Sequence, residues 1–109
     1  MSKLERNIDQ QIRNRLASRP DIIARKRHGS RFSAKEPDWL FIVLGRSIAI
    51  EMKVPGEEPD KGQALRLREY AAAGTRTATC TDVNQVIDII NEEEARMRRL
   101  LEYEASGYT

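Results

Sequence analysis

The sequence has very few of the residues that build several common kinds of site. Its 109 residues include one cysteine, Cys80, and one histidine, His28. A lone cysteine excludes a disulfide framework and a cysteine-rich zinc site, so a reducing, cytoplasmic setting is expected. A lone histidine argues against zinc sites built from paired histidines and weakens any Ser-His-Asp arrangement.

Long apolar runs are absent as well. The longest, Trp39 to Leu44, has six residues, against the ~18 that a membrane span requires. The first residues contain no apolar segment of the signal-peptide kind, so we expect neither membrane insertion nor export. Hydrophobic residues make up 39% of the chain and charged residues 33%, which excludes a disordered chain. The length indicates a single domain, residues 1–109.

The charges are unevenly distributed, although the net charge is only +2. Residues 1–35 hold ten basic and three acidic residues, whereas residues 36–109 hold nine basic and fourteen acidic ones. A basic part beside an acidic part indicates a polyanion, such as nucleic acid, contacting one face. The alternative is a solvated surface of mixed charge.

Periodicity predicts an α/β domain with the element order α-β-β-β-α-β-α. Apolar residues recur at every fourth position from Leu4 to Leu16, as on one face of a helix that Pro20 would end. Gly74 is a typical C-cap for the second helix. The expected helices are 3–18, 60–73 and one from 82 onward, and the expected strands are 21–28, 38–44, 47–53 and 75–80. A central mixed sheet flanked by helices is the simplest architecture for this order.

The strands 38–44 and 47–53 are predicted to form a hairpin closed at Gly45-Arg46. Because alternate residues of a strand share a face, Glu51 and Lys53 should project together beside the small Ala49. Asp38 opens the neighbouring strand at the same end of the hairpin. Two carboxylates would therefore converge beside one ammonium group.

Such a group suits a hard divalent cation, because Mg²⁺ takes oxygen ligands and often uses only one or two carboxylates. A bound cation of this kind supports phosphodiester hydrolysis, and Lys53 could orient the water or stabilise charge on the phosphorus centre. The alternative is a surface pair between Glu51 and Lys53, worth about 0–1 kcal/mol.

Two more polar residues are candidates for the same site. Glu5 lies on the apolar stripe of the first helix, where a carboxylate needs a partner or a metal ion. Gln63 lies in the first turns of the helix that follows Lys53, within reach of the site. The alternatives are a solvated helix end for Glu5 and an exposed polar residue for Gln63.

The densest basic stretch comes just before Asp38, and we expect it to contact nucleic-acid phosphates. The alternative is a solvated, charged strand edge that prevents edge-to-edge pairing. The candidate nucleic-acid-binding residues are Arg25, Lys26, Arg27, His28, Ser30, Arg31 and Lys35.

Taken together, these residues resemble the VRR-NUC domain, a branch of the PD-(D/E)xK nuclease superfamily. The resemblance rests on Glu5 in a leading helix, Pro37-Asp38, Glu51-Met52-Lys53 and Gln63, with Gly74 before the last strand. It covers about residues 4–90 and leaves 91–109 as a helical extension that either caps the sheet or forms a dimer contact.

The resemblance implies a restriction-endonuclease-like core and an endonuclease that depends on Mg²⁺ or Mn²⁺. Asp38, Glu51 and the Met52 carbonyl would bind the metal, with Glu5 acting through metal or water. Lys53 would be the catalytic lysine, and Gln63 would orient site groups. It also implies branched DNA such as Holliday junctions as substrate, a homodimer, no nucleotide cofactor, and the cytoplasm of a bacterial or phage-infected cell.

One residue departs from the family pattern. Glu36 stands where the family usually has glycine before Pro-Asp, which puts the local geometry in question. The rival hypothesis is a nucleic-acid-binding module that keeps the fold without the chemistry. The intact set of Asp38, Glu51 and Lys53 favours the enzyme.

Overall fold

A computed structural model describes residues 3–27 and 35–107. It confirms the predicted α/β fold and the order α-β-β-β-α-β-α. The elements are α1 Lys3–Leu16, β1 Ile23–Lys26, β2 Trp39–Val43, β3 Arg46–Met52, α2 Lys61–Ala72, β4 Arg76–Cys80 and α3 Val83–Ala105.

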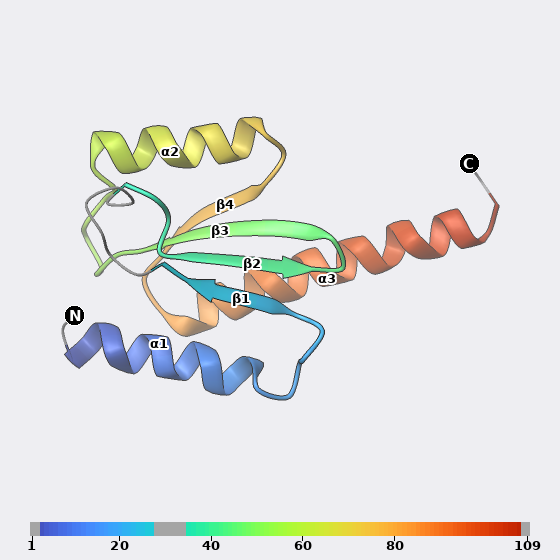
Figure 1. The fold of residues 1–109 in the computed structure, drawn as a ribbon, viewed down its shortest axis with the longest axis horizontal. Helices are drawn as coiled ribbons and strands as arrows, with labels where there is room; N and C mark the ends of the chain where they lie inside the picture. Colours follow the sequence, from blue (N-terminus) through green and yellow to red (C-terminus); the bar gives the residue numbers. More distant parts are fainter. Residues whose placement is uncertain (1–2, 28–34, 108–109) are drawn as a thin grey trace.

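The four strands form one mixed sheet in the order β1-β2-β3-β4. The first three pair antiparallel, and β4 pairs parallel to β3. The parallel pair requires a crossover, which α2 supplies. Figure 1 shows α2 over one face of the sheet, with α1 and α3 over the other. The sheet is therefore covered on both faces.

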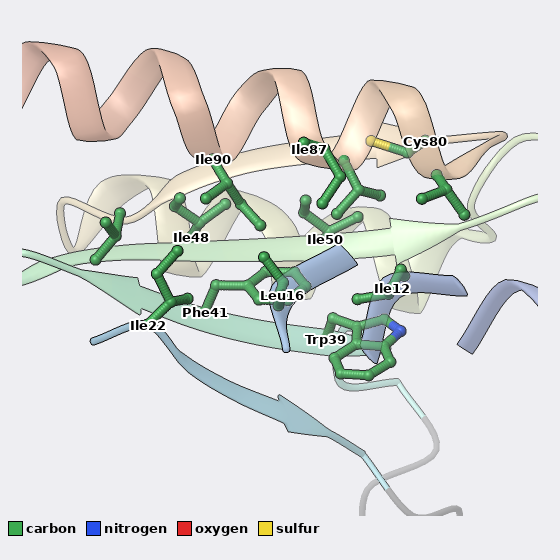
Figure 2. Packing of buried hydrophobic residues seen from close by; sticks show 13 residues of the cluster. Ile12, Leu16, Ile22, Trp39, Phe41, Ile48, Ile50, Cys80, Ile87 and Ile90 are labelled. Atoms are coloured by element: carbon green, nitrogen blue, oxygen red, sulfur yellow. The ribbon is translucent and has the colours of Figure 1, made fainter. Parts of the chain in front are cut away.

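The apolar core lies on the face that α1 and α3 cover. Ile12 and Leu16 of α1 reach the sheet beside Trp39 and Phe41 of β2, whose rings stack with their centroids 5.4 Å apart (Figure 2). On β3, the alternate residues Ile48 and Ile50 are fully buried in the same cluster. This confirms the predicted facing of β3 and leaves Ala49, Glu51 and Lys53 for the face under α2.

The hairpin turn lies one residue earlier than predicted. Val43 pairs with Arg46, so the two loop residues are Leu44 and Gly45, not Gly45 and Arg46. Both have positive φ, 49° and 80°, as a two-residue turn compatible with strand twist requires. The predicted turn at Gly45-Arg46 is wrong by one residue because leucine rarely has positive φ, so the sequence does not mark Leu44 as a turn residue.

The first helix and the first strand are both shorter than predicted. The first helix ends at Leu16 because the chain turns at once, with Arg19 donating its backbone N–H to the Leu16 carbonyl at 3.0 Å. The first strand begins at Ile23, because Ile22 still belongs to that turn and donates to the Arg19 carbonyl at 3.2 Å. His28, the predicted end of that strand, lies outside the described residues.

The last helix runs without a break through the predicted extension. It begins at the cap Asp82, whose side chain accepts the backbone N–H of Gln85 at 2.9 Å. Its C-terminal part extends beyond the sheet (Figure 1). Glu93 is its last buried residue, and Leu100 and Leu101 are about half exposed. Of the helices in the described part of the chain, none is long and apolar enough to span a membrane.

A buried carboxylate ties α3 to the sheet at the end remote from Asp38. Glu93 is 1% exposed and is paired with Arg46 at 3.2 Å and with Arg76 at 3.1 Å. Arg76 also pairs with the exposed Glu92, at 3.1 Å. Because Glu93 is desolvated, its ion pairs depend on good geometry, and losing one partner is costly.

We expect Glu93→Gln to lower the free energy of unfolding by roughly 1.5–3 kcal/mol, because two guanidinium groups lose a charged acceptor. Urea denaturation measures this loss. Glu92→Gln is the matched control and should change stability by less than about 0.5 kcal/mol. Equal losses in the two variants would contradict this assignment.

Candidate active site

The hairpin brings Asp38 and Glu51 together at one end of the sheet. Asp38 immediately precedes β2, and Trp39 pairs with Ile50, so the two carboxylates come from adjacent positions on neighbouring strands. The Asp38 side chain is held in place, since its Oδ2 accepts the backbone N–H of Met52 at 2.7 Å. Its Oδ1 lies 3.4 Å from Nη2 of Arg27.

Glu51 is a buried acid with an unused oxygen. Its residue is 2% exposed, which excludes the alternative of an exposed surface pair with Lys53. Its Oε2 is buried and has no hydrogen-bond partner among the described residues. Burial first, and then the neighbouring carboxylate of Asp38, raise the pKa of Glu51 to about 8, although Lys53 and Arg27 oppose the shift.

Gln63 links the start of α2 to Glu51. Its Nε2 lies 3.5 Å from Oε1 of Glu51, while its Oε1 accepts the backbone N–H of Asp60 at 3.0 Å. Asp60 returns a bond, because its Oδ1 accepts the backbone N–H of Gln63 at 2.8 Å. This reciprocal capping box fixes the amide of Gln63 and turns its nitrogen toward the carboxylate.

These residues face a cleft of about 420 Å³ bounded by α1, the β2–β3 end and the start of α2. Lys53, which follows β3, lines this cleft with the two carboxylates and Gln63. The remaining walls come from Ile8, Asp9, Lys26, Arg27, Met52, Val54, Pro55, Glu57 and Thr81. Four of the five predicted catalytic residues, from three separate segments, thus share one concave surface.

The wall that α1 contributes differs from the sequence prediction. Glu5 belongs to α1, but its side chain lies outside the described part of the structure. Asp9, which lies off the apolar stripe of the first helix, is nevertheless only 8% exposed and pairs with Lys26 of β1 at 3.4 Å. Helical periodicity could not show this, because the position of Asp9 depends on β1 lying alongside. The only sequence feature that could have indicated the burial of Asp9 is its position next to Ile8, a residue of the apolar stripe.

The basic stretch is only partly free to contact a ligand. Arg25 is exposed on β1. Lys26 pairs with Asp9, Arg27 with Asp38, and Lys35 with Asp60 at 2.7 Å. The other three predicted nucleic-acid-binding residues, His28, Ser30 and Arg31, lie outside the described residues.

The acid pair fits a hard divalent cation. Among the side chains that the structure describes in residues 3–27 and 35–107, no group of three His, Cys, Asp or Glu is suited to hold a metal ion. The side chain of Glu5 is not among those described. Two carboxylates nevertheless suffice for Mg²⁺, which keeps several of its waters. The unpartnered Oε2 of Glu51 is the observation that indicates a missing positive partner.

Glu36 is anchored to α2, which explains how this departure from the family pattern is accommodated. Its Oε2 accepts the hydroxyl hydrogen of Tyr70 at 2.7 Å, and its Oε1 pairs with Nε of Arg66 at 3.0 Å. The bond to Glu36, together with partial burial, raises the pKa of the Tyr70 hydroxyl. Nothing in the sequence pattern linked these positions, which are 34 residues apart.

Comparison with known proteins identifies the fold. No family model matches the chain, and no curated protein sequence matches it. Solved structures do match, and two of them are similar over most of their length. One is a VRR_NUC domain, with TM-score 0.65, 20% identity and coverage of 83% of this chain and 97% of the other. Another is a VRR_NUC domain protein, with TM-score 0.65, 19% identity and coverage of 80% of this chain and 84% of the other. The chain has the nuclease-like fold of a VRR_NUC domain. The resemblance read from the sequence is therefore confirmed at the level of fold.

The acid pair predicts an unusual pH dependence of stability when no metal is present. Because folding raises the pKa of Glu51 from 4.5 to about 8, the folded protein binds this proton more tightly than the unfolded chain does. The contribution of Glu51 to stability is thus fully present below pH 4.5 and is lost as the pH rises through 8. Glu51→Gln removes this loss.

In EDTA at pH 9, we expect the free energy of unfolding of Glu51→Gln to exceed that of the wild type by on the order of 2 kcal/mol, with a correspondingly higher unfolding temperature. Near pH 4 we expect the two proteins to be equally stable. Thermal unfolding followed by circular dichroism measures both values. A constant difference across this pH range would show that Glu51 ionises normally.

Proposed function

We propose that this chain is a metal-dependent DNA endonuclease that hydrolyses phosphodiester bonds. The observation that carries the proposal is the buried Glu51, with an unpartnered oxygen, beside Asp38 in a cleft that Lys53 also lines. The nuclease-like fold supports the proposal. Because fold alone does not determine chemistry, the proposal depends on the residues of the cleft. We propose branched DNA, such as a Holliday junction, as the preferred substrate.

Asp38 and Glu51 would hold Mg²⁺ or Mn²⁺, with the Met52 carbonyl beside them and Glu5 acting directly or through water. When bound, the cation would polarise a phosphoryl oxygen and lower the pKa of a water molecule. Gln63 would keep Glu51 oriented through its amide nitrogen. Lys53 would stabilise the negative charge that develops on the phosphoryl oxygens as water attacks phosphorus.

The basic residues would hold the DNA backbone beside the cleft. Arg25 and Lys35 are the exposed members of the described part of the stretch, and His28, Ser30 and Arg31 are proposed to act with them. Lys26 and Arg27 line the cleft and would meet a phosphate there while keeping their acidic partners. A homodimer would place two clefts on one junction, as paired cuts require.

A cleavage assay on four-way junction, flap, duplex and single-stranded DNA tests the proposal, with Mg²⁺, Mn²⁺ or EDTA. We expect cutting that EDTA abolishes and that Lys53→Ala slows by at least about 100-fold, because charge stabilisation at the phosphate is lost. Lys61→Ala removes an exposed lysine on α2 and is the matched control. DNA binding without cutting under every metal condition would favour the rival hypothesis of a binding module.

Removing a backbone contact should weaken DNA binding without regard to sequence. We expect Arg25→Ala to reduce affinity and to lower the slope of log affinity against log salt by about one, since one phosphate contact releases about one counterion. Arg99→Ala, on the part of α3 that leaves the sheet, is the control. Equal effects of both variants in fluorescence anisotropy titrations would contradict a DNA contact at Arg25.

A further inference from the structure

The helix α2 adds no residue to the buried core, and several of its polar side chains contact the segments that form the site. None of its residues is buried, and Leu65 is 51% exposed. Gln63 contacts the site carboxylate Glu51, and the N-cap Asp60 pairs with Lys35, which lies in the segment before Asp38, at 2.7 Å. An element held in this way is stabilised less by apolar burial than by the groups it bonds, so its position depends on them.

A further polar attachment of α2 is to Glu36, which accepts one hydrogen bond and forms one ion pair. Both carboxylate oxygens of Glu36 are used, one by the hydroxyl of Tyr70 at 2.7 Å and the other by Arg66 at 3.0 Å. All three side chains are at least partly shielded from water, with Glu36 31% exposed and Arg66 42% exposed at the side chain. A hydrogen bond to a charged carboxylate in such a setting is stronger than one between neutral groups.

The connection from Glu36 to Asp38 is short and stiff. Pro37, which separates them, is buried and has a fixed φ, and it restricts the backbone of Glu36 as well. On its other side, Asp38 is already held, because its carbonyl accepts the backbone N–H of Arg27 at 2.8 Å. A displacement of Glu36 would therefore move the Asp38 side chain relative to Met52 and Glu51.

We infer that Glu36, held by Tyr70 and Arg66 of α2, is a positioning residue that sets where the Asp38 carboxylate lies relative to Glu51. The same helix positions Glu51 through Gln63, so α2 determines the spacing of both acids. Where it concerns metal binding, the inference rests on the proposed function. Where it concerns the position of Asp38, it stands on the contacts alone.

Amide hydrogen exchange in the metal-free protein tests the position of Asp38 directly. The Met52 amide is the reporter, because it donates to Oδ2 of Asp38. The Lys53 amide is the internal reference, because it donates to the Cys80 carbonyl at 2.9 Å. We expect Tyr70→Phe and Glu36→Gln to speed exchange at Met52 roughly five- to tenfold and to leave Lys53 unchanged. Asp38→Ala defines the maximum effect.

Glu69→Gln is the matched control, since Glu69 pairs with Arg66 at 2.9 Å but forms neither a hydrogen bond nor an ion pair with Glu36 in the described part of the chain. Unchanged exchange at Met52 in both Tyr70→Phe and Glu36→Gln, with a clear increase in Asp38→Ala, would overturn the inference. Equal acceleration at Met52 and Lys53 would also overturn it, because that result indicates general loosening.

Calorimetric titration with Mn²⁺ alone adds the readout that concerns the metal. We expect the affinity of Tyr70→Phe and Glu36→Gln to fall roughly tenfold and that of Glu69→Gln to stay at the wild-type value. Wild-type protein that binds no Mn²⁺ would contradict the proposed metal site, whereas exchange at Met52 would still decide the positioning role. Tight Mn²⁺ binding by all variants would contradict the positioning role in metal binding and leave the proposed function intact.

Discussion

The pairing register of the β2–β3 hairpin is the constraint on which the rest of the structure depends. The turn at Leu44 and Gly45 sets Val43 opposite Arg46 and, four residues on, Trp39 opposite Ile50. That register leaves Asp38 beside Glu51 and directs both toward α2. A slip of one residue would turn Glu51 into the apolar core and move Ile50 out of it, because side chains alternate between the two faces.

The two faces of this sheet are built by different kinds of interaction. The face under α1 and α3 is apolar, with Trp39, Ile48 and Ile50 fully buried, and its burial is the main stabilising contribution. The face under α2 carries a carboxylate whose pKa is raised by burial, and its covering helix is bonded through polar side chains. Stability is thus concentrated on one face, while the other keeps two acids close at a cost in electrostatic free energy.

Much of this arrangement could be predicted because it depends on local pattern. The run from Trp39 to Leu44 is apolar at every position, as in a strand covered on both faces, and Glu51 lies between the apolar Ile50 and Met52, which places it on the opposite face. Hairpin spacing then predicted that Asp38 and Glu51 would meet. The roles of Lys53 and Gln63 stay predictions, as does the role of Glu5, although the structure puts Lys53 and Gln63 on the cleft.

Local patterning therefore accounts for the order of the elements, the buried face of each strand and the proximity of the two acids. The periods of two residues for a strand and 3.6 for a helix can be recognised from the order of apolar and polar residues alone. The tertiary structure alone decided which residues distant in the sequence contact one another around the two acids. The ion pair of Asp9 with Lys26 joins α1 to β1, and the hydrogen bond and ion pair of Glu36 with Tyr70 and Arg66 join the segment before β2 to α2. No periodicity encodes such contacts, since they depend on how helices settle on the sheet.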